Sequence, residues 1–103
     1  MALLLARSTQ IDVATAGTEV NVRTTVTRVR YALFVADPDN AGALFIGNNV
    51  ASLGSVSSTT GIQLNPGDMV EIQADGADLI DLSSFWVDSA TNGDDLHVFW
   101  LTE

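Results

Sequence analysis

Few residues in this sequence are of the types that carry enzyme chemistry. His97 is the only histidine among 103 residues, and there is no cysteine. Catalysis needs a proton-transfer group beside a nucleophile or a metal, yet no serine lies in a Gly-x-Ser-x-Gly pattern, and phosphate loops and dinucleotide fingerprints are absent. We therefore expect a protein that is not an enzyme and needs no cofactor, with His97 packed inside or at the rim of a strand.

Acidic residues occur in close pairs, at Asp37 and Asp39, Asp78 and Asp81, and Asp94 and Asp95. All of them lie where turns are expected, and glycosidase chemistry would require two carboxylates that face each other across a cleft. Residues 37–42 begin like a calcium loop, but position five is Ala41 and position twelve is Asn48. Asx turns are therefore favoured here, and a calcium-binding module is the weaker alternative.

The two tryptophans, Trp86 and Trp100, allow two interpretations. Side by side on a surface they would form a stacking platform for a sugar ring, as in a carbohydrate-binding module. Single aromatic residues within strands are more often anchors of a core or of an interface. We favour the second interpretation.

The elements that must position these residues are short runs of strand formers, broken by Gly, Asn, Asp, Pro and Ser. The runs cover residues 18–22, 24–36, 43–47, 69–74, 84–88 and 96–101. Residues 65–68, Asn-Pro-Gly-Asp, are typical of a type II turn, and the Ser- and Thr-rich residues 48–60 form a long excursion. The pattern predicts an all-β, single-domain β-sandwich of jelly-roll or Greek-key type with six to eight strands.

The longest run, residues 24–36, and the run at 43–47 predict a β-hairpin around the turn-forming residues 37–42. Strand alternation places Val29, Tyr31, Leu33 and Val35 on one face, and Arg28, Arg30, Ala32 and Phe34 on the other. In the closing run, Leu96, Val98 and Trp100 point one way, and Phe99 and Leu101 the other. A strand that is apolar on both faces is expected to be covered on both, from outside by its own chain or by another subunit.

The first 17 residues are expected to form an N-terminal arm or edge strand, and residues 18–103 the sandwich. Leu3, Leu4 and Leu5 are expected either to pair as an edge strand in the sheet of their own chain or to extend to the sheet of a neighbouring subunit. No stretch approaches the roughly 20 apolar residues of a membrane helix, and the apolar opening lacks a basic leader. We expect no membrane partner and a soluble protein that is made and used without export through a membrane.

Charge is segregated along the chain, which carries 13 acidic and four basic residues and a formal net charge of −9. All four basic residues are arginines within the first 30 positions, whereas from residue 31 onward there are eleven acidic residues and no basic one. We expect such a chain to repel nucleic acid unless its few cations cluster, and we expect no direct nucleic-acid partner. Arginine is suited to paired contacts with carboxylates, so Arg23, Arg28 and Arg30 are expected to meet those of a neighbouring subunit or partner, or else those of their own chain, such as Asp37, Glu71 and Asp81.

Six segments that combine turns and strand centres carry a family likeness: residues 31–40, Gly42, and residues 44–47, 61–68, 81–87 and 96–101. They resemble recurring stretches of small virion proteins of tailed bacteriophages, above all of capsid decoration (cement) proteins. The similarity runs over residues 26–101, and the N-terminal segment shows no match.

This resemblance implies a β-sandwich, often a homotrimer, that is made in the host cytoplasm, sits on the outer surface of the capsid and clamps neighbouring major capsid subunits. A tail or fibre-attachment adaptor of the virion is the structural alternative. The resemblance and the final strand, which is apolar on both faces, together lead us to expect an interface. We expect it to include Leu3, Leu4, Leu5, Arg23, Arg28, Arg30, Trp86, Phe99 and Leu101.

Overall fold

The computed structural model describes residues 5–48, 56–57, 60–76 and 78–102, which form ten short strands and one turn of 3-10 helix. The strands are β1 (Leu5–Val13), β2 (Val20–Asn21), β3 (Arg28–Val29), β4 (Tyr31–Ala36), β5 (Leu44–Gly47), β6 (Ile62–Leu64), β7 (Met69–Gln73), β8 (Ile80–Asp81), β9 (Trp86–Ser89) and β10 (Asp94–Thr102), and the 3-10 turn is η1 (Leu82–Ser84). In this part of the chain no helix is long and apolar enough to cross a membrane. The prediction of an all-β chain is confirmed.

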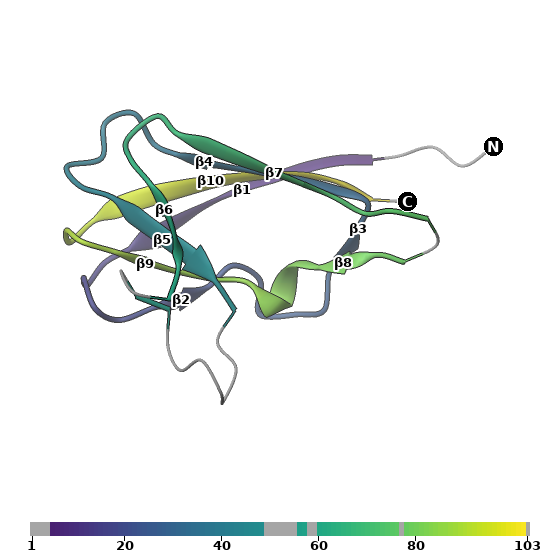
Figure 1. Ribbon diagram of the computed structural model, residues 1–103, viewed down its shortest axis with the longest axis horizontal. Helices are drawn as coiled ribbons and strands as arrows, with labels where there is room; N and C mark the ends of the chain where they lie inside the picture. The colour runs from purple at the N-terminus through teal and green to yellow at the C-terminus, as the bar shows by residue number, and fades with distance from the viewer. Residues whose placement is uncertain (1–4, 49–55, 58–59, 77, 103) are drawn as a thin grey trace.

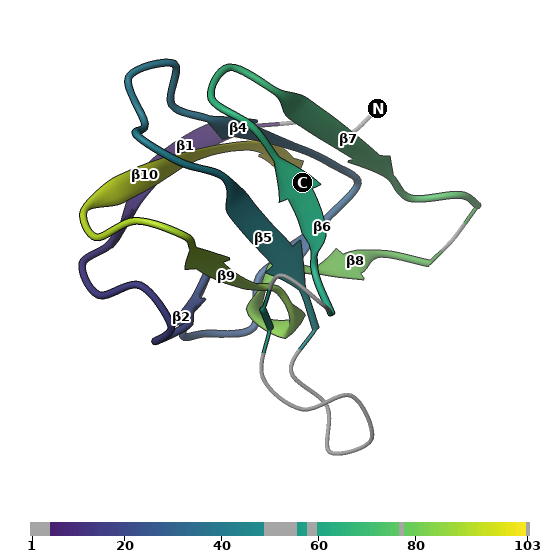
Figure 2. The ribbon, with the colours of Figure 1, turned by 60° about the vertical axis from the view of Figure 1, so that its left-hand side comes forward.

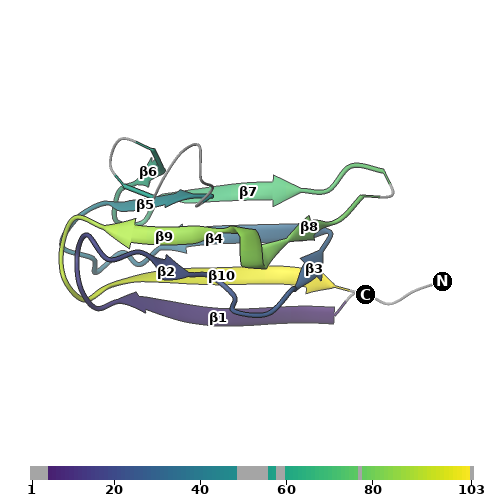
Figure 3. The same cartoon turned by 90° about the horizontal axis from the view of Figure 1, so that it is seen from below.

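The strands build two antiparallel sheets of four strands each and one separate pair (Figure 1). The first sheet has the order β1-β10-β4-β7, the second sheet has the order β2-β9-β5-β6, and β3 pairs with β8. Seen face on, the two sheets overlie each other (Figure 3). This is the layered arrangement of a β-sandwich, in which each sheet buries one face against the other.

The core lies between the two sheets, where alternate residues of each strand point inward. Both sheets contribute apolar side chains that are at least nine-tenths buried: Ile11, Val13, Ala32, Phe34, Leu44, Ile46, Leu64, Val87, Leu96, Val98 and Trp100. Three more come from the β3–β8 end and its connections, namely Val22, Val29 and Leu82. The predicted inward direction of Leu96, Val98 and Trp100 is therefore confirmed.

The predicted hairpin over residues 24–47 is wrong. The strand β4 pairs with β10 and β7 in the first sheet, whereas β5 pairs with β6 and β9 in the second, so the connection between them crosses from one layer to the other (Figure 2). The buried carboxylate of Asp94 holds this crossing loop, because its two oxygens accept hydrogen bonds from the backbone N–H groups of Ala41 and Gly42, each at 2.9 Å.

The predicted single strand over residues 24–36 is also interrupted, at Arg30. The N–H of Arg30 bonds to the carbonyl of Leu101, and its carbonyl accepts the N–H of Ala74, while the preceding strand β3 leaves the first sheet to pair with β8. Because the chain bends here, Val29 is fully buried in the core and does not share the face of Tyr31. Strand alternation applies only within one continuous strand.

The predicted turn at residues 65–68 is present and connects the two sheets. The N–H of Asp68 bonds to the carbonyl of Asn65 at 2.9 Å, and Gly67 has φ of +85°, as the third position of a type II turn requires. The same turn is tied to β4, because the N–H of Gly67 and the carbonyl of Asp68 both bond to the backbone of Ala36.

Candidate interaction surface

The side of the first sheet that faces away from the core is a broad surface, which we call the outer face. Strand register aligns its residues in rows across the four strands. Its members are Ala6, Ser8, Gln10 and Asp12 of β1; Asp95, His97, Phe99 and Leu101 of β10; Tyr31, Leu33 and Val35 of β4; and Met69, Glu71 and Gln73 of β7. None of these residues belongs to the core cluster.

The centre of the outer face is apolar. Phe99 is 38% exposed and Met69 is 59% exposed, and Leu33, Val35 and Leu101 between and beside them are half-buried. The ring of Phe99 packs edge-on against that of Tyr31, with centroids 6.4 Å apart. Since large apolar side chains rarely gather on the surface of a monomer without a role, this centre marks a candidate binding surface.

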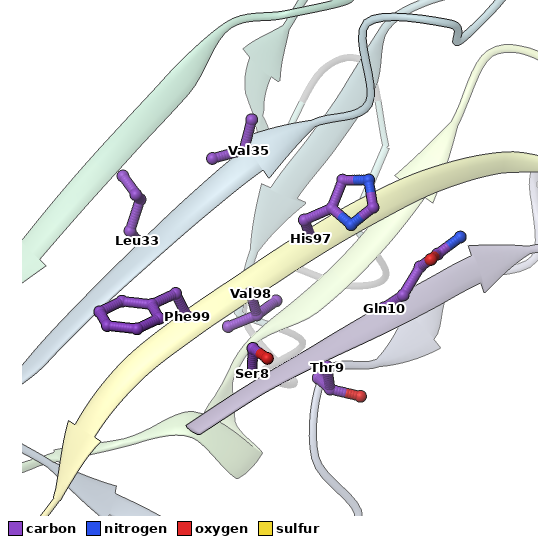
Figure 4. A pocket seen from close by; sticks show the side chains of 8 residues that line it. All are labelled: Ser8, Thr9, Gln10, Leu33, Val35, His97, Val98 and Phe99. Carbon is purple, nitrogen blue, oxygen red and sulfur yellow. The ribbon is translucent and has the colours of Figure 1, made fainter. Parts of the chain in front are cut away.

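A shallow hollow of about 290 Å³ lies in the outer face where three strands meet. Figure 4 shows the side chains around it, which come from β1 (Ser8, Thr9 and Gln10), β4 (Leu33 and Val35) and β10 (His97, Val98 and Phe99). Its lining is mainly apolar toward β4 and polar toward β1. A hollow of this kind can receive one side chain of a bound partner.

One polar contact borders the apolar centre on the β7 side. The hydroxyl of Tyr31 donates a hydrogen bond to Glu71 Oε2 at 3.1 Å. Desolvation, followed by this hydrogen bond and the negative charge of Glu71, raises the pKa of the Tyr31 hydroxyl. Tyr31 therefore remains a neutral donor to Glu71 at the edge of the apolar centre.

Another polar group, His97 with Asp37, lies at the opposite end of the outer face. His97 Nε2 is 2.8 Å from Asp37 Oδ2, and the His97 side chain is 43% exposed. The pKa of Asp37 is lowered, first by the hydrogen bond from the backbone N–H of Asp39 and then by the one from His97. His97 thus lies partly exposed on the outer face, between Gln10 and Val35, and bonds to Asp37.

The acidic residues around His97 form hydrogen bonds within the chain. Asp37 accepts the N–H of Asp39 at 2.8 Å, an Asx turn, and the side chain of Asn40 bonds to both backbone groups of Asp95. Burial, and next the charge of its cross-strand neighbour Asp12, raise the pKa of Asp95. Among the described residues, no three His, Asp or Glu side chains are arranged to hold a metal ion.

The outward side of the second sheet is partly covered by the chain itself, unlike the outer face of the first sheet. Phe45 points outward from β5, opposite in direction to the core residues Leu44 and Ile46, yet it is only 7% exposed. The backbone near Gly61 lies against it, and the nearby Val56 is 2% exposed. The chain thus covers this part of the second sheet, whereas no described residue covers the centre of the outer face.

The predicted interface residues do not lie on one surface. Phe99 and Leu101 are neighbours on the outer face, whereas Trp86 is half-buried in β9 of the second sheet. Leu5 is 47% exposed at the start of β1, which pairs along its whole length with β10 as an edge strand. Leu3 and Leu4 lie outside the described residues. Since Trp100 is 4% exposed and faces the core, the two tryptophans do not form a sugar-stacking platform.

The three predicted arginines lie near the β3–β8 end and contact their own chain. The guanidinium of Arg23 lies 5.2 Å above the ring of Trp100 and donates to Thr27 Oγ1. Arg28 is exposed and opposes Asp81 across the strand pair, and its charge contributes to the lowered pKa of that carboxyl, after the larger effect of hydrogen bonds from Ser83 and Thr27. The side chain of Arg30 donates to the carbonyl of Gly76 at 3.3 Å.

Several residues of the apolar centre were not among the predicted interface residues: Tyr31, Leu33, Val35 and Met69. The run of β4 is apolar on both faces, so its sequence does not say which face is turned to the core. For Met69 the sequence does indicate a surface position, because the alternation of residues 69–74 directs it outward with Glu71 and Gln73.

No protein-family model matches this sequence, and no curated protein matches it either. The geometry of the outer face is therefore the structural ground for a functional proposal.

Proposed function

We propose that this chain is a structural, non-enzymatic protein of a bacteriophage virion, a capsid decoration protein that binds the major capsid lattice and stabilises the head. The observation that carries the proposal is the apolar centre of the outer face, around Leu33, Val35 and Phe99, which no described residue covers. A protein that reinforces a shell needs affinity and no reaction centre.

The finer fold type, a jelly roll, is part of the proposal. It is supported by the strand orders β1-β10-β4-β7 and β2-β9-β5-β6, because each step along the chain between these eight strands changes sheet, except the β5–β6 hairpin. Eight strands in two sheets with such connections are typical of jelly rolls, which include viral capsid domains and lectins. Since unrelated functions share this fold, it is compatible with the proposal and does not select it.

The physical task of such a protein is to add contact area between capsid subunits against the pressure of packaged DNA. A standard interface buries about 1,600 Å² in total. Repetition over a lattice adds avidity, so no single contact has to be tight. A small sandwich with a sheet face whose apolar centre no described residue covers is suited to this task.

Imaging of the virion tests the location. Particles of the phage that encodes this chain are labelled with gold-conjugated antibody raised against the purified protein, with a phage deleted for the gene as the control. We expect label over the whole head. Label confined to the tail or the fibre base would favour the adaptor role, and unlabelled particles would contradict a virion role altogether.

The proposal includes self-association into a homotrimer, as the resemblance implies. Light scattering of the purified chain at micromolar concentration should then give three times the protomer mass of 10.9 kDa. A monomer at all concentrations would remove the trimer from the proposal without affecting the location measured on particles.

A further inference from the structure

We propose that the outer face docks on a protein surface that has an apolar centre and a rim of arginine or lysine, and that this partner is a capsid subunit and not a second copy of the chain. The inference rests on the proposed function and names the partner of the same surface.

Charge on the outer face is of one sign. Asp12 and Asp95 are cross-strand neighbours at one end, Asp37 adjoins them, and Glu71 stands on the β7 side. No arginine or lysine is among the residues of the outer face, and its one group able to become cationic, His97, already contacts Asp37. A partner with basic residues at its rim complements this arrangement.

A second copy that stacked its own outer face on this one would bring like charges together. Glu71 and the Asp12–Asp95 pair of both copies would share the rim of the contact, within a chain whose formal charge is already −9. Juxtaposed like charges select against such a pairing, most of all where burial removes solvent screening. Nucleic acid is disfavoured by the same acidic rim.

The outer face, with its acidic rim, is smaller than one side of a standard interface. Four strands about 4.8 Å apart, with residues spaced at about 3.3 Å, give a face of roughly 20 Å by 20 Å, or about 400 Å². Each partner of a standard interface contributes about 800 Å². A contact of that size therefore uses the whole outer face, acidic rim included. The apolar centre provides the anchor, and the hollow beside Phe99 receives one partner side chain.

The test measures binding of the full chain to capsids purified from a phage that lacks this gene, by co-sedimentation at increasing salt. Two variants alter the outer face, Phe99→Ser in the centre and Glu71→Lys at the rim. Two matched controls alter exposed residues of β6 in the second sheet: Ile62, which is 60% exposed, to Ser, and Gln63 to Lys. Thermal melts establish that all four variants are folded, and Glu71→Lys keeps the test decisive if Phe99→Ser is unstable.

We expect Phe99→Ser to weaken capsid binding by about tenfold or more, as truncation of a buried anchor does. Glu71→Lys should weaken it and reduce its dependence on salt, because one attractive pair at the rim becomes repulsive. The two β6 variants should bind within about twofold of the wild type, since surface changes outside an interface are close to neutral.

Three other results would overturn the inference. Equal binding by all variants would show that capsids bind elsewhere on the chain, and would leave the proposed function intact. A change in the mass of the free protein caused by Phe99→Ser or Glu71→Lys would assign the outer face to self-association. Absence of capsid binding by the wild type would remove the proposed function, and the capsid partner with it.

Discussion

Adjacent side chains of β10 have opposite roles. Trp100 is 4% exposed, lies in the core and carries the guanidinium of Arg23 above its ring, whereas Phe99 is 38% exposed on the outer face. The alternation of a β-strand explains why residues one position apart separate in this way. A change at Trp100 or Arg23 is thus expected to affect folding, and a change at Phe99 to affect binding.

The carboxylate of Asp81 joins the loop before β3 to the start of η1, because its Oδ1 accepts hydrogen bonds from Thr27 N at 3.1 Å, Ser83 N at 3.0 Å and Ser83 Oγ at 2.9 Å. It also caps η1. Asp81→Ala should therefore lower the free energy of unfolding at pH 7 by about 1–2 kcal/mol. Urea denaturation measures this, with the exposed Asp75→Ala as the matched control.

The pKa of Asp81 determines how the loss of unfolding free energy in Asp81→Ala depends on pH. Hydrogen bonds, first that from the backbone N–H of Ser83, lower its pKa in the folded state. The ionised carboxylate therefore contributes its stability above the ordinary carboxyl pKa of about 3.9, and that contribution is lost as the pH falls through the lower folded pKa. The difference between wild type and Asp81→Ala should shrink below about pH 4. An equal stability of both proteins at pH 7 would contradict the assignment.

At the scale of elements, the outer face depends on the central position of β10. This strand pairs with β1 on one side and β4 on the other, and the turn at residues 65–68 places β7 at the far edge of β4. Register then aligns Phe99 with Leu33 and Glu71 in one row. The candidate surface is thus assembled from four segments that are distant in the sequence.

The turn before β7 offers a test at this scale, because a Cβ added at Gly67 would meet nothing within 4 Å, yet its φ is +85°. Gly67→Ala should destabilise the protein by about 1–2 kcal/mol through the backbone alone. Gly67→Asn should cost less, since Asn adopts this conformation more readily. Thermal or urea unfolding of the pair checks this, and equal losses in both variants would argue against the backbone as the cause.

For the whole molecule, the dominant feature is a formal charge of −9 on 103 residues. Such self-repulsion opposes the compact state and is screened by salt. A rise in NaCl from about 0.02 to about 0.5 M at pH 7 should therefore raise the melting temperature, by roughly 4–8 °C for each 1 kcal/mol of repulsion removed. Near the pI of about 4.1 the same salt step should have a smaller effect, and an equal rise there would exclude net charge as its cause.

The local chemistry of the sequence was sufficient to predict the all-β class, the turn at residues 65–68 and the inward direction of Leu96, Val98 and Trp100, because turn residues and alternation act within a few positions. It also predicted that Phe99 and Leu101 belong to a binding surface. Both residues lie on the outer face, and binding there remains a prediction.

Only the tertiary structure decided that β4 and β5 part into different sheets and that Leu33 and Val35 join Phe99 on the outer face. Which strands pair depends on interactions between segments that are distant in the sequence, and a local pattern does not determine those interactions. In addition, β4 is apolar on both sides, with Ala32 and Phe34 against Leu33 and Val35. When both faces of a strand can be buried, burial alone leaves its orientation open, and the bend at Arg30 and the register with β10 settle it.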